Sequence, residues 1–250
     1  MDLSQVSPGL WLAVLAANSL GGLLKENDRA GLPLFAVPAL AAITLVEDAV
    51  VLMVFPSVGA NLWLVMNHRR YRNLLREHLP FLVTGFIGGL SGTGLLVLVS
   101  DRGLKLLLVI WLGLYLIRYF SNRNSLKLFG ADRKSGYPLG LAAGTIQGST
   151  GISAQVVAPY YHTRGLAPEA YAFAVAFTFL LFSVSEIIAM ANLQLLTTNR
   201  IRLSLAALVP SLVFTRLGIS LSRKISIALF NKFLLTIFIL MAIKLIMDIL

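Results

Sequence analysis

Residues 146–161 constrain the fold most, because they interrupt an apolar stretch that is otherwise long enough to cross a membrane. They include two glycines and one proline. Apart from the two tyrosines at the end, five of their side chains carry a hydroxyl or amide group. Glycine and proline weaken a helix, and hydrocarbon cannot pair the backbone groups that are released. Such a break is tolerated where protein covers it or where it lines a wet cavity. It is therefore the first place to look for a binding site.

The composition places the whole chain in a membrane. Hydrophobic residues make up 57% of the 250 residues and charged residues only 13%, and the mean hydropathy is +0.82. A soluble domain has about 25% charged residues. We therefore expect an all-α polytopic membrane protein. The apolar segments are 8–24, 31–44 (short), 47–66, 79–99, 104–121, 137–162 (interrupted), 168–193, 203–221 and 228–249.

The order of segments repeats along the chain. Pro38 and Pro159 are 121 residues apart, and the same offset relates Asp48 to Glu169. In each half a weak or broken pair of segments is followed by an acidic helix start and three long segments. This pattern is typical of a transporter built from two repeats. We predict two pseudo-symmetric halves of about four transmembrane helices each, with broken or re-entrant Gly/Pro-rich segments: residues 1–121 and 136–250, joined by a basic loop at 122–135.

The relative orientation of the halves depends on the broken pairs. If each pair enters the membrane and returns, the halves are inverted and both termini lie outside. If each pair crosses once, the halves are parallel. The loop charges do not separate the two arrangements, and we expect the inverted one.

The net charge of +10 comes largely from two short basic loops, near residues 69–76 and 123–134. Cytoplasmic loops of membrane proteins carry such an excess of lysine and arginine. This explains the charge without a nucleic-acid partner, although contacts to lipid headgroups stay open.

Common enzyme signatures are missing from the sequence. It has no cysteine, no phosphate-binding loop and no zinc-protease motif, and its three histidines are scattered. We expect neither catalysis nor a cofactor or metal.

The break is suited to an anion. A helix that starts within the membrane presents unpaired N–H groups and the positive end of its dipole. Side chains beside it add donors, and glycine lets a ligand approach the backbone. The alternative is that the glycines allow close helix packing and the hydroxyls link helices. The candidate binding residues are Gln147, Gly148, Ser149, Thr150, Gly151, Ser153 and Gln155.

The first half contributes three weaker candidates, Asn18, Ser57 and Asn61. Asn18 precedes the twice-interrupted segment that contains Pro33 and Pro38. Ser57 and Asn61 lie inside the span 47–66, where an amide needs partners and should face the protein interior. Each can either contact a ligand or join two helices.

Glu186 lies far from both ends of segment 168–193. A charge at mid-bilayer costs about 2.5–3.5 kcal/mol or more, so Glu186 must be paired, in water or protonated. We consider it the candidate for coupling transport to protons.

Taken together, the chain resembles the TauE/SafE (sulfite exporter) family of bacterial membrane transporters over nearly its whole length. The second half carries the resemblance in Gly148-Ser-Thr-Gly151, Pro159 and Gly165-Leu166. The first half contributes Asp48-Ala49, Pro56, Asn61 and Gly94. The family has a glycine-rich signature, which is clear in the second half of this chain. In the first half, charged and amide residues stand at 25–29, where further glycines would be expected.

The resemblance implies a multi-pass carrier in the bacterial cytoplasmic (inner) membrane that moves, mostly by export, a small anion such as sulfite or a sulfonate. Its partners would be that anion and the lipid bilayer, and a homo-oligomer is left open. Two alternatives remain: a non-transporting component of a larger membrane complex, and an anion channel.

Overall fold

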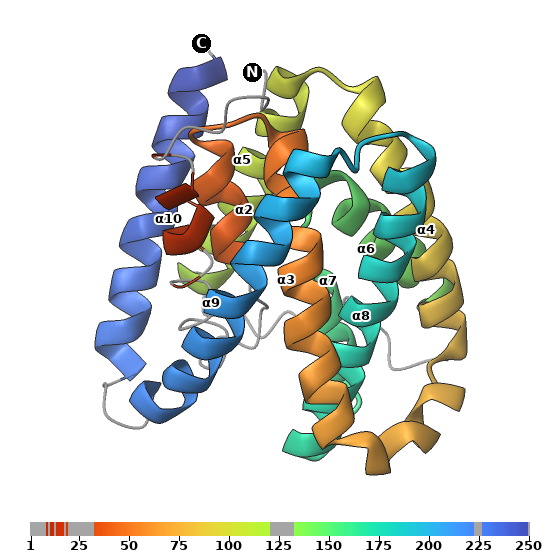
Figure 1. Ribbon diagram of the computed structural model, residues 1–250. Helices are drawn as coiled ribbons and strands as arrows, with labels where there is room; N and C mark the ends of the chain where they lie inside the picture. The colour runs from red at the N-terminus through yellow and green to blue at the C-terminus, as the bar shows by residue number, and fades with distance from the viewer. Residues whose placement is uncertain are drawn as a thin grey trace.

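The computed structural model describes residues 9, 11, 12, 14–17, 19, 33–120, 133–222 and 227–249, and these residues form helices without strands. Most of the helices are long rods that run between the two ends of the molecule (Figure 1). In chain order the helices are α2 (Pro33–Ala41), α3 (Val46–Asn67), the 3-10 helix η2 (Arg69–Arg76), α4 (Leu79–Leu98), α5 (Asp101–Phe120), the 3-10 helix η4 (Arg133–Ser135), α6 (Gly136–Thr150), α7 (Ala154–His162), α8 (Pro168–Asn192), α9 (Thr198–Ser222) and α10 (Ile227–Ile249).

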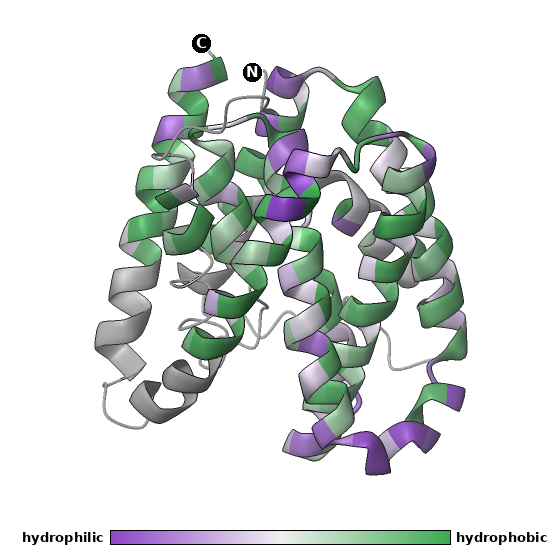
Figure 2. Ribbon diagram, viewed as in Figure 1, coloured by the Kyte–Doolittle hydropathy of each residue, from purple (hydrophilic) through white to green (hydrophobic). Residues whose placement is uncertain are grey.

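Three of these helices, α3, α4 and α8, are long and apolar enough to cross a membrane. Helices α5, α9 and α10 have 20, 25 and 23 residues, and at ~1.5 Å per residue each reaches the ~30 Å of a bilayer core. Apolar residues dominate the middle of the molecule, and polar residues gather at its two ends (Figure 2). The predicted all-helical membrane class is confirmed.

Helices α3 and α8 lie side by side at the centre and run in opposite directions (Figure 1). Helix α3 also packs against α9, and α8 also packs against α4. The centre of the molecule is therefore built by residues from both parts of the sequence. The nine-residue α2 precedes α3, as the nine-residue α7 precedes α8.

Helices α4 and α6 pack backbone to backbone, and glycines on both helices make this possible. A Cβ atom on Gly148 would lie 2.5 Å from Gly89 O and from Thr93 N, which is too close for any side chain. Gly144 likewise faces the backbone of Gly85. The packing alternative for glycine therefore holds at Gly148, where a small residue allows two backbones to touch.

The start of α6 and the end of α7 both lie beside the first turn of α4. A Cβ on Gly136, the first residue of α6, would lie 3.3 Å from Phe81 N and from Tyr160 Oη. The rings of Phe81 and Tyr160 are stacked with their centroids 3.8 Å apart. The start of α6 and the last turn of α7 are thus neighbours at the beginning of α4.

Candidate functional site

The predicted break lies between α6 and α7. Helix α6 ends at Thr150, and Gly151 follows in the left-handed conformation with φ of 69°. Glycine adopts this conformation without steric cost, which is why it terminates helices so often. The Gly151 N–H donates to Gln147 O at 2.6 Å. Helix α7 then starts at Ala154, so residues 137–162 do not form one continuous helix.

Protein rather than lipid surrounds the break. Ile152 N donates to Thr150 Oγ1 at 3.3 Å, and Ile152 O accepts a 2.5 Å hydrogen bond from Trp111 Nε1 of α5. The Cβ position of Gly151 is 3.0 Å from a methyl group of Val37 and 3.7 Å from one of Val50. Backbone groups released by the turn are thus paired inside the protein, as hydrocarbon surroundings require.

Three candidate side chains meet at the break through Gln147. Its Nε2 donates to Gly151 O at 3.1 Å and to Glu186 Oε1 at 3.3 Å. Its Oε1 accepts a 2.8 Å hydrogen bond from Ser153 Oγ. Gln147 therefore connects the end of α6, the start of α7 and the middle of α8 in one buried polar network.

Glu186 is the acidic member of this network and is only 2% exposed. Its hydrogen-bond partner is the neutral amide of Gln147. Among the described residues, no cation lies within ion-pair distance of it. The carboxyl group thus sits in the protein interior beside a group that carries no compensating charge.

Gln155 lies in the first turn of α7 and differs from Gln147. Both amide atoms of its side chain are buried, and neither has a hydrogen-bond partner among the described residues. A buried amide without partners costs roughly 1–3 kcal/mol, so native proteins rarely leave one. The Gln155 amide is therefore an unsatisfied polar group at the start of α7.

The comparison with known families agrees with this architecture. The sequence profile described as Sulfite exporter TauE/SafE matches residues 6–245. The chain belongs to the TauE/SafE family. Members of this family are membrane transporters, which is consistent with the expectation that the chain is not an enzyme. No curated protein and no solved structure matches the chain.

In this TauE/SafE chain two of the first-half candidates, Ser57 and Asn61, connect to α8 one turn from Glu186. Asn61 Nδ2 donates to Ser57 Oγ at 3.2 Å, and Ser183 Oγ of α8 donates to Ser57 Oγ at 3.4 Å. Ser57, Asn61 and Ser183 are all buried. Residues three apart share one face of a helix. Ser183, which bonds to Ser57, and Glu186, which bonds to Gln147, therefore lie on the same face of α8.

The other second-half candidates have structural partners. Ser149 Oγ donates to Thr145 O at 2.9 Å, and Thr150 Oγ1 donates to Ile146 O at 2.7 Å, both within α6. Gly148 faces α4, as described above. Asn18 lies outside the described residues.

Sequence reasoning missed two residues, Trp111 at the break and Ser183 on α8. Ser183 precedes Glu186 by three residues, and this helical spacing within a span could have identified it. Trp111 stands in the middle of an apolar segment, where an indole N–H needs an acceptor. The identity of that acceptor could not be read from the sequence.

A buried aromatic cluster holds the far end of α7. His78, just before α4, is 4% exposed and packs edge-to-face on Tyr161, with ring centroids 4.9 Å apart. The guanidinium carbon of Arg164 lies 3.5 Å from the ring centroid of Tyr160. Arg164 Nη1 also donates a hydrogen bond to the backbone carbonyl of Tyr160. Burial, with a smaller effect of Arg164, lowers the pKa of His78 from its ordinary value of 6.5 to about 4.

Proposed function

We propose that this protein is a secondary carrier that moves a small anion, such as sulfite or a sulfonate, across the bacterial cytoplasmic membrane, mainly by export. The observation that carries the proposal is the buried helix break at Gly151–Ser153, where Gln147 of α6, Ser153 and Glu186 of α8 form one polar network. Broken helices that line an internal site are typical of secondary transporters.

The donors at the break fit an oxyanion. Gln155 offers two N–H groups without partners among the described residues, and it lies in the first turn of a helix. A helix start favours a nearby negative charge by roughly 0.3–2 kcal/mol. Ser153 and Gln147 bond to each other at the break and can exchange this bond for a bond to the ligand. We assign ligand contact to these three residues and positioning of the break to Gly148, Thr150 and Gly151, and we assign no separate role to the Ser149 hydroxyl, which bonds within α6.

Ser57 and Asn61 complete the proposed site from the first half. Their hydroxyl and amide groups meet Ser183, one turn from Glu186. A ligand between α3 and α8 could therefore contact both halves, as transport by relative motion of the halves requires.

Glu186 is the proposed proton-coupling group. A carboxylate and an anionic ligand in one buried site repel each other, so the anion binds better when Glu186 carries a proton. Binding of anion and proton would then be linked, and the two would move together.

Two features support inverted repeats with re-entrant segments as the framework of the carrier. Helices α3 and α8, which correspond in the proposed repeats, run antiparallel (Figure 1). The start of α6 and the end of α7 lie beside the same residue, Phe81, as expected if the chain enters the membrane and returns. Inverted repeats are one of the arrangements on which alternating access is built.

Flux measurements in proteoliposomes test the proposal. We expect saturable uptake or efflux of labelled sulfite or sulfoacetate, and loss of at least tenfold in rate with Gln147→Leu. Ser149→Ala is the matched control, because the Ser149 hydroxyl donates to carbonyl groups of its own helix, α6, and this variant should retain most of the rate. Absence of flux for both anions, or equal rates for Gln147→Leu and the original protein, would contradict the proposed site. Flux that does not saturate would indicate a channel.

A further inference from the structure

Two arginine–carboxylate pairs occupy corresponding places at opposite ends of the molecule. Arg200, near the start of α9, places Nη2 2.6 Å from Glu47 Oε1 and 2.5 Å from Asp48 Oδ1 in the first turn of α3. Arg70, in η2, pairs with Glu169 in the first turn of α8.

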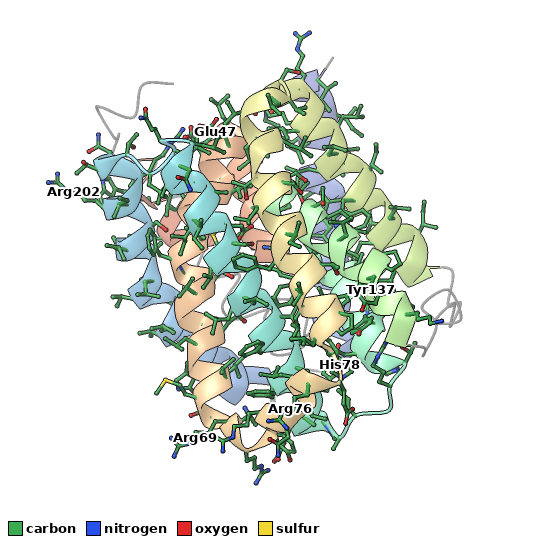
Figure 3. All side chains as sticks on the ribbon, turned by 90° about the vertical axis from the view of Figure 1, so that its right-hand side faces the viewer. Glu47, Arg69, Arg76, His78, Tyr137 and Arg202 are labelled. Carbon is green, nitrogen blue, oxygen red and sulfur yellow. The ribbon has the colours of Figure 1, made fainter. Side chains whose placement is uncertain are left out.

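The two pairs are reciprocal. Arg70 follows the last turn of α3 and binds the first turn of α8, while Arg200 follows α8 and binds the first turn of α3. Because α3 and α8 are antiparallel, one pair closes each end of their contact. Figure 3 shows the separation: Glu47 and Arg202 lie at one end of the molecule, and Arg69 and Arg76 lie at the other.

The pairs differ strongly in burial. The side chains of Arg200 and Asp48 are 13% and 2% exposed, whereas those of Arg70 and Glu169 are 67% and 53% exposed. Arg200 also donates to Leu195 O at 3.0 Å through Nη1. Desolvated charge pairs with several hydrogen bonds hold their geometry, whereas exposed pairs are screened and contribute little.

Neighbouring charges reinforce the buried end. Asp101 Oδ1, at the start of α5, accepts a 2.8 Å bond from Val46 N, the first residue of α3. Lys105 bridges Asp101 and Asp248 at 3.0 and 3.6 Å. The start of α3 is thus bonded to α5 and α9 together.

We propose that these two ion pairs are the alternating gates of the carrier, and that the structure, in which both pairs are formed, represents an occluded state. Each pair joins a residue before 121 to one after 136, so the two parts can separate at either end only if the pair at that end breaks. The inference rests on the proposed function only because a carrier must open one face at a time. It does not depend on the identity of the substrate.

The chain contains no cysteine, so a single introduced cysteine can report on the buried gate. Ser204 lies one turn after Arg200 on α9, is fully buried and donates to Leu52 O at 2.7 Å. The full-length Ser204→Cys protein would be reconstituted without substrate, and its rate of modification by a membrane-impermeant maleimide measured. Arg202→Ala is the matched control, because Arg202 is exposed and only two residues from Arg200.

Alternating gates predict opposite effects on this one reporter. We expect Arg200→Ala to speed modification at least tenfold, Arg200→Lys to have an intermediate effect, and Arg70→Ala to slow modification at least threefold. Arg202→Ala should leave the rate unchanged. The proposal is overturned if Arg200→Ala and Arg200→Lys leave the rate within twofold, or if Arg70→Ala does not slow it, since the Arg200 pair would then only stabilise the fold. Because the assay contains no anion, its failure is separable from a failure of sulfite flux.

Discussion

The indole Nε1 of Trp111 in α5 lies 2.5 Å from the carbonyl oxygen of Ile152, in the turn between α6 and α7. This contact pairs a backbone group that the helix break would otherwise leave unsatisfied in a buried place. Forty-one residues separate the two partners in the sequence. Helix α5 therefore supports the break through this one hydrogen bond.

Trp111→Phe removes this donor and keeps most of the ring. We expect a loss of about 1–3 kcal/mol in stability, because the Ile152 carbonyl stays buried without its partner. Thermal unfolding in detergent would detect this loss. Tyr137→Phe, which removes a hydroxyl from an exposed residue of α6, is the control and should leave the transition in place. An unchanged transition for Trp111→Phe would show that water replaces the indole.

Glu186→Gln tests proton coupling. The amide cannot take up a proton, so transport should stop responding to a pH gradient while anion binding is largely kept. A carrier that moves one proton gains about 1.4 kcal/mol, or roughly tenfold accumulation, per unit of pH difference. Accumulation in proteoliposomes with and without the gradient measures this. Glu77→Gln, at an exposed carboxyl before α4, should keep the response; a tenfold response retained by Glu186→Gln would remove Glu186 from the mechanism.

Gly148→Val should disrupt the contact between α4 and α6. Its side chain would meet the backbone of Gly89 and Thr93, and backbone cannot move aside as a flexible side chain can. We expect destabilisation of at least about 1–3 kcal/mol, seen as a lower yield of monodisperse protein in size-exclusion chromatography. Gly94→Val is the control, because no atom lies within 4 Å of its Cβ position. Equal yields would show that the two helices separate easily.

His78 should make the protein sensitive to acid. Its pKa is lowered from 6.5 to about 4 in the folded protein, so the unfolded state binds more protons between these values. The stabilising contribution is therefore complete above pH 6.5 and is lost as pH falls toward 4, by about 3 kcal/mol at most. Melting temperatures at pH 7 and pH 4.5 should differ less for His78→Gln than for the original protein. His68→Gln, at a more exposed histidine, should keep the original difference.

Much of the fold could be predicted from local patterns. The apolar segment 168–193 became α8, Pro168–Asn192, because about 20 apolar residues in a membrane satisfy their backbone only as a helix. The interruption near Gly151 was predicted from glycine and hydroxyl residues, and Gly151 ends α6 with a positive φ. Both features could be predicted because they depend on the backbone conformation of single residues and on the surrounding solvent, not on contacts between distant residues.

The use of each polar group could not be predicted in the same way. Ser149 and Ser153 look equivalent in the sequence, yet Ser149 bonds to its own helix and Ser153 bonds to Gln147. Gly148 and Gly151 also look alike, but one faces α4 and the other turns the chain. The difference depends on the side of α6 from which a residue projects and on what lies there.

The sequence by itself determined that this chain forms membrane helices, where one of them must break, and which family it belongs to. Hydrophobicity and backbone conformation follow from the residue types, so these properties can be read without knowing the neighbours. Only the tertiary structure decided that Glu186 meets Gln147, that Ser183 meets Ser57, and that Arg200 holds the start of α3. These contacts join residues 39, 126 and 152 positions apart, and only the packing of whole helices brings such groups together.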